Sequence, residues 1–188
     1  MSSSDGVSAS NIVNVTDLNP TNNGTYVWEY SINNGASWQV LNDTGGDSSS
    51  FTLPANVRYP ANALQVRVTY PKTGVFSVGF NEQLFEIDTT TPLSPSFTLQ
   101  SDSGIANNDG ITSDNILLVT GLETGGGVWE YSIDSGTTWT VGVDTTFEAT
   151  TNTTYAAGSI QVRQTDLAGN MALASSHTDT YIFDNQVP

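Results

Sequence analysis

Apolar and polar residues alternate along much of the chain with a period of two. In the stretch 26–32, large apolar side chains fall at every second position, beginning with Tyr26, Trp28 and Tyr30. The stretch 64–68 repeats the pattern with a leucine and two valines. Alternation of this kind predicts β-strands that bury one face and leave the other in water. No stretch has the 3.6-residue period of an amphipathic helix, so we expect an all-β fold.

The alternating pattern belongs to an internal repeat. Residues 27–32 (VWEYSI) return at 128–133, and residues 65–67 (QVR) return at 161–163. Two further matches pair 5–8 (DGVS) with 109–112 (DGIT), and Asp88…Pro92 with Asp184…Pro188. A chain that repeats its own strands in the same order is expected to fold into one domain per copy.

The repeat predicts two domains, at residues 1–90 and 91–188. Segment 95–108 has no counterpart in the first copy, so we expect the first domain to lack its first strand. Its loops are longer and divergent around 19–25 and 41–50. Each copy holds about seven short strands separated by turn signals, a density typical of an immunoglobulin-like β-sandwich. The expected fold class is therefore all-β, with two tandem immunoglobulin-like β-sandwich domains.

Composition excludes several classes of function. Among 188 residues, 19 are Asp or Glu and only 4 are Lys or Arg, giving a net charge of −15. Nucleic acids and anionic membrane surfaces both need a cationic footprint, so neither is an expected partner. The chain has no Cys, and its one His is His177, which excludes disulfides, thiolate-bound zinc and multi-histidine metal sites;. The aliphatic run 116–119 is too short for membrane insertion;.

The second copy resembles a known family. The motif WEYSIDSGTTW at 129–139, the run YAAGSIQVRQTDLAGN at 155–170 and the Asp184-x-x-x-Pro188 linker resemble bacterial Ig-like extender repeats. Such repeats belong to large RTX-type, type I-secreted surface and biofilm adhesins. The resemblance covers nearly all of 88–188. The first copy matches in its middle and end, but YPKTG at 70–74 stands where the family has Asp-x-Ala-Gly-Asn.

The resemblance implies a mechanical function at the bacterial cell surface, outside the cell. An extender of this family is a spacer that holds a distal ligand-binding region away from the cell, and calcium stiffens its domain junctions. We therefore expect a monomer without enzyme activity, whose partners are neighbouring Ig-like repeats of the parent chain. The Met-Ser-Ser-Ser start is what we expect of a piece taken from a longer protein.

The loops contain the oxygen ligands that calcium requires. Calcium takes six to eight oxygens from carboxylates, amides, backbone carbonyls and water, and it tolerates irregular loops. Ig topology would place one group of acidic residues at the junction of the two domains and another at the far end of the second. The predicted junction ligands are Asp5, Asp88, Asp166 and Asn170, and the predicted far-end ligands are Asp102, Asp109 and Asp184. The alternative is that these side chains only cap turns through local hydrogen bonds.

A binding module for carbohydrate or a host protein is the rival function. Trp38, Trp139 or the first copy's loops with Asp43 and Asp47 would be its platform. Trp28 and Trp129 are expected in the domain cores instead, where Ig-like sandwiches commonly bury a Trp. An enzyme is not supported, because the sequence offers no nucleophile–base pair.

Three other features of the sequence yield structural expectations. Residues 132–139 match the Asp-box hairpin of sialidase-like propellers, in which the aspartate, here Asp134, closes its own turn. Glu29 and Glu130 are either solvated or bonded to arginines across a sheet. His177 is expected on an exposed strand face.

Overall fold

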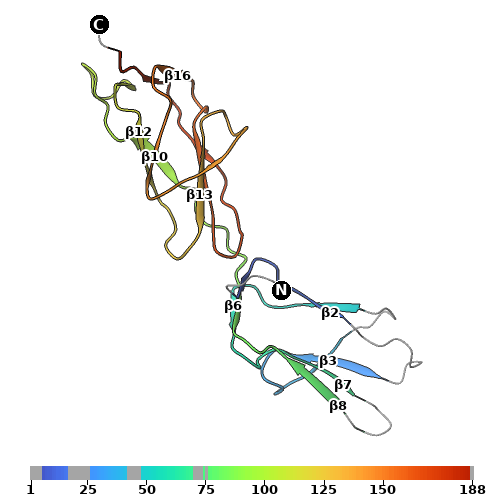
Figure 1. The fold of residues 1–188 in the computed structure, drawn as a ribbon. Helices are drawn as coiled ribbons and strands as arrows, with labels where there is room; N and C mark the ends of the chain where they lie inside the picture. The colour runs from blue at the N-terminus through green and yellow to red at the C-terminus, as the bar shows by residue number, and fades with distance from the viewer. Residues whose placement is uncertain (1–5, 17–25, 42–47, 70–73, 75, 187–188) are drawn as a thin grey trace. The chain divides into compact units, whose positions relative to one another are not determined.

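The computed structural model describes residues 6–16, 26–41, 48–69, 74 and 76–186. The chain divides into two compact units, residues 1–90 (unit 1) and 91–188 (unit 2), and each is described by itself below (Figure 1). The described residues form strands and no helix, which confirms the prediction of an all-β chain. Accordingly, no membrane-spanning helix is found among them.

The strands of both units are short. Those of unit 1 are β1 (Val7–Ser8), β2 (Ile12–Thr16), β3 (Val27–Ser31), β4 (Gln39–Val40), β5 (Ser48–Thr52), β6 (Val57–Tyr59), β7 (Gln65–Thr69), β8 (Phe76–Phe80) and β9 (Phe85–Ile87). Those of unit 2 are β10 (Ser96–Leu99), β11 (Ile111–Thr112), β12 (Ile116–Thr120), β13 (Val128–Ser132), β14 (Thr140–Val141), β15 (Thr146–Glu148), β16 (Thr153–Tyr155), β17 (Gln161–Thr165), β18 (Ser175–Ser176) and β19 (Tyr181–Phe183).

The two units share a sheet topology. Unit 1 contains the sheets β4-β3-β7-β8 and β1-β9-β6, and unit 2 contains the matching sheets β14-β13-β17-β18 and β11-β19-β16. In both units the last strand pairs in parallel with a two-residue strand, so that Val7 of β1 lies opposite Glu86 of β9 and Ile111 of β11 lies opposite Ile182 of β19. The third sheet differs, because it is β10-β12-β15 in unit 2 and β2-β5 in the described part of unit 1.

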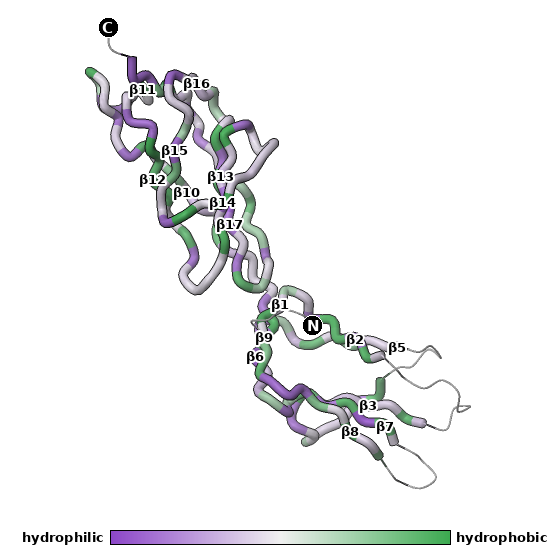
Figure 2. Tube along the Cα trace, in the orientation of Figure 1, coloured by the Kyte–Doolittle hydropathy of each residue, from purple (hydrophilic) through white to green (hydrophobic). Residues whose placement is uncertain are grey.

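Each unit has its own hydrophobic core, built from the apolar positions of the alternating pattern. Figure 2 colours β2 and β12, which line the two cores, as largely hydrophobic. In unit 2, Tyr131 of β13 stacks on Phe147 of β15 with ring centroids 4.4 Å apart. In unit 1, Tyr30 stacks on Phe51 at 4.0 Å. The repeated sequence therefore packs in the same way twice.

The tryptophans of the repeated VWEYSI strands differ in burial. Trp129 is buried in the core of unit 2, as predicted, whereas Trp28 is only partly buried. The backbone N–H of Gly142 donates to Trp129 O, and the N–H of Leu41 donates to Trp28 O, so Gly142 and Leu41 are equivalent positions. Because Gly142 has no side chain, the indole of Trp129 occupies the space beside it in unit 2. In unit 1 the equivalent residue is Leu41, whose buried side chain itself occupies core space.

Candidate functional site

The loop between β10 and β11 brings two of the predicted calcium ligands together. Asp102 Oδ2 accepts a hydrogen bond from the backbone N–H of Gly110 at 3.0 Å, and Asp109 Oδ1 accepts one from Ile111 N–H at 3.0 Å. Gly110 has a φ of +75°, and a Cβ there would lie 2.7 Å from Thr180 O, so a side chain at this position would clash;. The glycine lets the acidic loop lie directly against the last strand.

A hollow beside this loop is lined by three carboxylates. Asp102 and Asp109 share it with Asn108, Asp179 and Tyr181. Burial, and then the negative charges of Asp179 and Asp102, raise the pKa of the Tyr181 phenol above its ordinary value. The two carboxylates therefore act on the same phenol, and the hollow is a region of negative potential that favours a cation.

Asp102 has a second feature that is expected of a cation site. Its Oδ1 is buried and has no hydrogen-bond partner among the described residues. A buried carboxylate oxygen without a partner is unfavourable, since it has lost its water and gained nothing in exchange. A calcium ion would satisfy this oxygen, so the donor set of the hollow fits calcium in this respect. However, within the described part of the chain no three His, Asp or Glu side chains form a group that could hold a metal ion.

Asp184 does not share that hollow. It lines a second one with Asn152, Thr154 and Gln186 at the end of β19. Its Oδ1 accepts the backbone N–H of Gln186 at 3.0 Å, and its own N–H donates to Thr112 O. The predicted far-end set is thus divided between two hollows of unit 2.

The remaining predicted ligands occupy turns. Asn170 donates from its backbone N–H to Asp166 Oδ1 at 2.8 Å and from Nδ2 to Asp166 Oδ2 at 2.9 Å. In unit 1, Asp88 Oδ1 accepts the N–H of Thr90 at 2.9 Å. These bonds are the local caps that the alternative interpretation expects, although a carboxylate oxygen has lone pairs for a further ligand. Asp5 lies outside the described residues.

The Asp-box hairpin is closed by Asp134, as predicted. Asp134 Oδ1 accepts from the N–H of Thr138 at 2.8 Å and from Ser132 Oγ at 2.7 Å, and its Oδ2 accepts from Thr138 Oγ1 at 2.6 Å. The bonds from Thr138, followed by that from Ser132, lower the pKa of Asp134 to about 2. Asn33 makes the corresponding bonds in unit 1, to Ser37 N–H at 2.9 Å and Ser31 Oγ at 2.9 Å. Both residues have a structural role.

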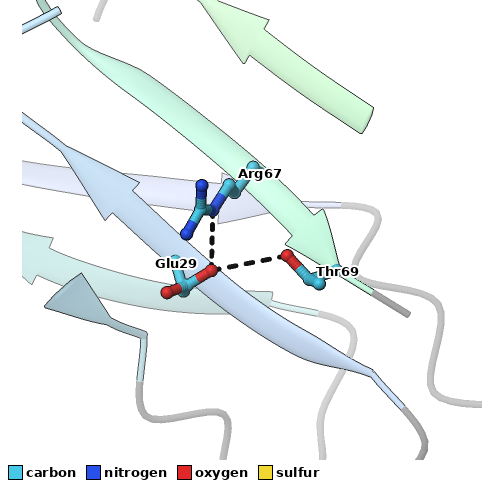
Figure 3. A network of polar contacts seen from close by, with 3 residues as sticks. All are labelled: Glu29, Arg67 and Thr69. Carbon is cyan, nitrogen blue, oxygen red and sulfur yellow. Dashed lines mark hydrogen bonds and ion pairs between the residues drawn. The ribbon is translucent and has the colours of Figure 1, made fainter. Parts of the chain in front are cut away.

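The repeated glutamates are paired with arginines rather than simply solvated. Figure 3 shows Glu29 on β3 facing Arg67 and Thr69 of β7, with Arg67 Nε 2.7 Å from Glu29 Oε2. This hydrogen bond lowers the pKa of Glu29 and outweighs the effect of its partial burial. Unit 2 repeats the pair, with Arg163 Nε 2.8 Å from Glu130 Oε2.

Each of these arginines also covers a tryptophan. The guanidinium carbon of Arg67 lies 4.0 Å from the ring centroid of Trp38, and that of Arg163 lies 3.9 Å from the ring of Trp139. One face of each indole is therefore occupied by a cation–π contact. A sugar ring could stack there only after displacing the arginine. The other predicted platform, the loops with Asp43 and Asp47, lies outside the described residues.

The prediction for His177 was wrong. Its side chain is 7% exposed, and its Nε2 lies 3.1 Å from the N–H of Ile160. The sequence around His177 is short and polar and gives no sign of this burial, because Ile160, to which His177 is bonded, lies 17 positions away. Sequence reasoning also missed Asp179, whose carbonyl oxygen lies 2.6 Å from His177 Nδ1. Asp179 lies outside the repeated motifs, so the sequence did not indicate that it would line the hollow with Asp102.

No protein-family model and no curated protein matches the chain. Among solved structures, it is similar to one described as "Structural insight into host cell surface retention of a 1.5-MDa bacterial ice-binding adhesin", with 17% identity and a TM-score of 0.37. The match covers 93% of this chain and 61% of that one, so this chain spans less than two thirds of its length.

Proposed function

We propose that this chain is a structural extender module of a bacterial cell-surface adhesin, built from two tandem immunoglobulin-like β-sandwiches. The observation that carries the proposal is the duplication of structural devices in both units. The Glu29–Arg67 pair with Trp38 returns as Glu130–Arg163 with Trp139, and the hairpin cap returns as well. Polar residues that recur in every copy as packing and turn elements are expected of a spacer. An enzyme would concentrate them in one cleft.

Calcium is the proposed cofactor. The hollow with Asp102, Asp109 and Asp179 is our preferred site in unit 2, because Asp102 Oδ1 is buried there without a hydrogen-bond partner in the part of the chain that the structure describes. Asn108 and backbone carbonyls of the loop are suitable further donors. Asp88, Asp166 and Asn170 remain proposed ligands on the grounds of their chemistry. Without the ion, neighbouring carboxylates repel one another, so calcium should stiffen the ends of the units.

A calcium titration followed by calorimetry and thermal melting tests this site. We expect calcium to raise the melting temperature of the chain and Asp102→Asn to weaken binding. The asparagine keeps the shape and one oxygen but removes the charge. Glu148→Gln is the matched control, because Glu148 is an exposed carboxylate on β15 outside the hollow. Equal calcium affinity in Asp102→Asn and in the unaltered chain would overturn this assignment.

A protein-binding module is the second candidate, and one surface favours it. Phe76 and Phe80 of β8 are 59% and 55% exposed, and β8 pairs with β7 so that both fall on the same face as Arg67. In unit 2, Ser176 occupies the position of Phe80 and Met171 that of Phe76, so the pair of aromatic side chains is specific to unit 1. A glycan array and binding assays with host-surface extracts distinguish this candidate from a spacer. Loss of a specific interaction in Phe76→Ser plus Phe80→Ser would favour the binding module.

A further inference from the structure

The first strand of unit 2 shows what completes the edge of this fold. β10 runs antiparallel to β12, with Phe97 opposite Val119 and Leu99 opposite Leu117. The ladder continues beyond the strand, where Gln100 N–H donates to Ile116 O at 2.9 Å. Phe97 and Leu99 pack against the core of unit 2. β10 thus pairs the edge of β12 and covers the core.

β2 of unit 1 is the counterpart of β12. Leu53 N–H donates to Asn11 O at 2.8 Å, just as Ala149 N–H donates to Asn115 O at 2.9 Å in unit 2. The positions 11, 13 and 15 therefore direct their backbone groups toward β5. In an antiparallel strand the intervening residues direct theirs to the other side, so the N–H and C=O of Asn14 face away from β5. No strand of the described residues pairs with β2 on that side.

The core of unit 1 is correspondingly less closed. Val13 of β2 is 9% exposed, whereas its counterpart Leu117 is fully buried. Val15 is only partly buried, whereas Val119 is buried. Val66 of β7 is also partly buried, whereas the equivalent Val162 is fully buried. These are the residues expected to lose cover when a strand with the apolar side chains of β10 is missing.

We propose that the Asn14 side of β2 is an acceptor edge for an extended segment with the pattern of β10. The occupant is a strand whose apolar side chains alternate with small polar ones, as in Ser96–Leu99. It runs antiparallel to β2 and places its two apolar side chains opposite Val15 and Val13. The edge presents the outward backbone N–H and C=O of Asn14 for pairing, and Val13 and Val15 of the same strand supply the hydrophobic contact.

The acceptor edge lacks a side-chain hydrogen bond that holds the residues before β10 in unit 2. In unit 2, Gln164 Nε2 donates to Leu93 O at 2.6 Å, and Ser175 Oγ donates to Pro95 O, which holds the lead-in to β10. Val68 occupies the position of Gln164 in unit 1, as the pairings Trp28↔Val68 and Trp129↔Gln164 show. The added strand is held only by the ladder and its two apolar side chains. A covalently attached segment should therefore occupy the edge far better than a free peptide.

The test attaches a copy of residues 91–108 ahead of residue 5 of the full chain. This reproduces the spacing of unit 2, because 5–8 (DGVS) matches 109–112 (DGIT). We expect the melting temperature of unit 1 to rise by at least about 5 °C, the shift that a modest stabilisation gives a domain of this size. Hydrogen exchange at the Asn14 amide should slow at least about tenfold, because that N–H becomes part of a ladder.

Two controls separate strand addition from a non-specific effect. In the first, the attached copy carries Asp at the positions of Phe97 and Leu99, which should abolish both effects. In the second, Asn14→Pro removes the outward N–H without removing a bond to β5, and proline is tolerated on an edge of this kind. If Asn14→Pro does not fold, the first control still decides. Unchanged Asn14 exchange in the extended chain would overturn the proposal. So would a dimer of the unextended chain in which the Asn14 amide is already protected, since a second copy would then be the occupant.

Discussion

His177 Nε2 accepts a hydrogen bond from the backbone N–H of Ile160 at 3.1 Å, and Asn81 Oδ1 accepts the equivalent bond from Leu64 N–H at 2.8 Å. The second ring nitrogen, Nδ1, lies 2.6 Å from Asp179 O, and Asn81 Nδ2 donates to Gln83 O at 2.8 Å. The neutral imidazole therefore carries its proton on Nδ1. Two different side chains connect the same backbone groups in the two units.

This equivalence predicts which substitution of His177 the fold accepts. His177→Asn should retain most of the stability of unit 2, because an amide supplies both an acceptor and a donor. His177→Ala should lower the free energy of unfolding by about 1–3 kcal/mol, since it leaves the buried N–H of Ile160 without a partner. Chemical denaturation of the two variants measures the difference. Equal losses in both would contradict the proposed role.

Asp134 makes the hairpin of unit 2 sensitive to acid. Its pKa is lowered from 3.8 to about 2 by bonds that need the ionised form. A lowered pKa in the folded state contributes stability that is present above the unfolded pKa and is lost as the pH falls through the folded one. We therefore expect this contribution to disappear between pH 4 and about pH 2. An NMR titration of the Asp134 carboxyl against pH measures it.

Asn33 provides the matched comparison for this pH effect. It caps the same hairpin in unit 1 without a titrating group. Asp134→Asn should therefore make the stability of unit 2 less dependent on pH in this range while preserving the turn. If Asp134→Asn keeps the whole acid-dependent loss, other carboxylates cause it.

Gly142 is expected to be intolerant of any side chain. A Cβ at this position would lie 2.0 Å from the indole of Trp129, so the ring would have to leave its place in the core. Gly142→Ala should destabilise unit 2 by about 1–3 kcal/mol, the usual cost of overpacking a core. Gly79→Ala is the control, since no atom of the described residues lies within 4 Å of a Cβ there. Denaturant melts that move equally for both variants would rule out this explanation.

The sequence was sufficient to predict features that depend on local pattern. Alternation predicted the all-β fold, and the Asp-box motif predicted the turn that Asp134 closes, because its partners lie within four residues. Features set by distant contacts were not predictable. Burial of His177 depends on Ile160, and Asp102 and Asp179 line one hollow because β11 pairs with β19. The different burial of Trp28 and Trp129 depends on Leu41 and Gly142, which the aligned motifs do not cover.

Small-angle X-ray scattering with millimolar calcium and with a chelator tests the central proposal, a calcium-stiffened extender, most directly. We predict a longer and more uniform particle in calcium and a broader range of dimensions in chelator. The difference should be reduced in a chain with Asp88→Ala and Asp166→Ala, whereas Glu148→Gln should leave it unchanged. Superimposable scattering profiles of the unaltered chain under the two conditions would contradict calcium stiffening.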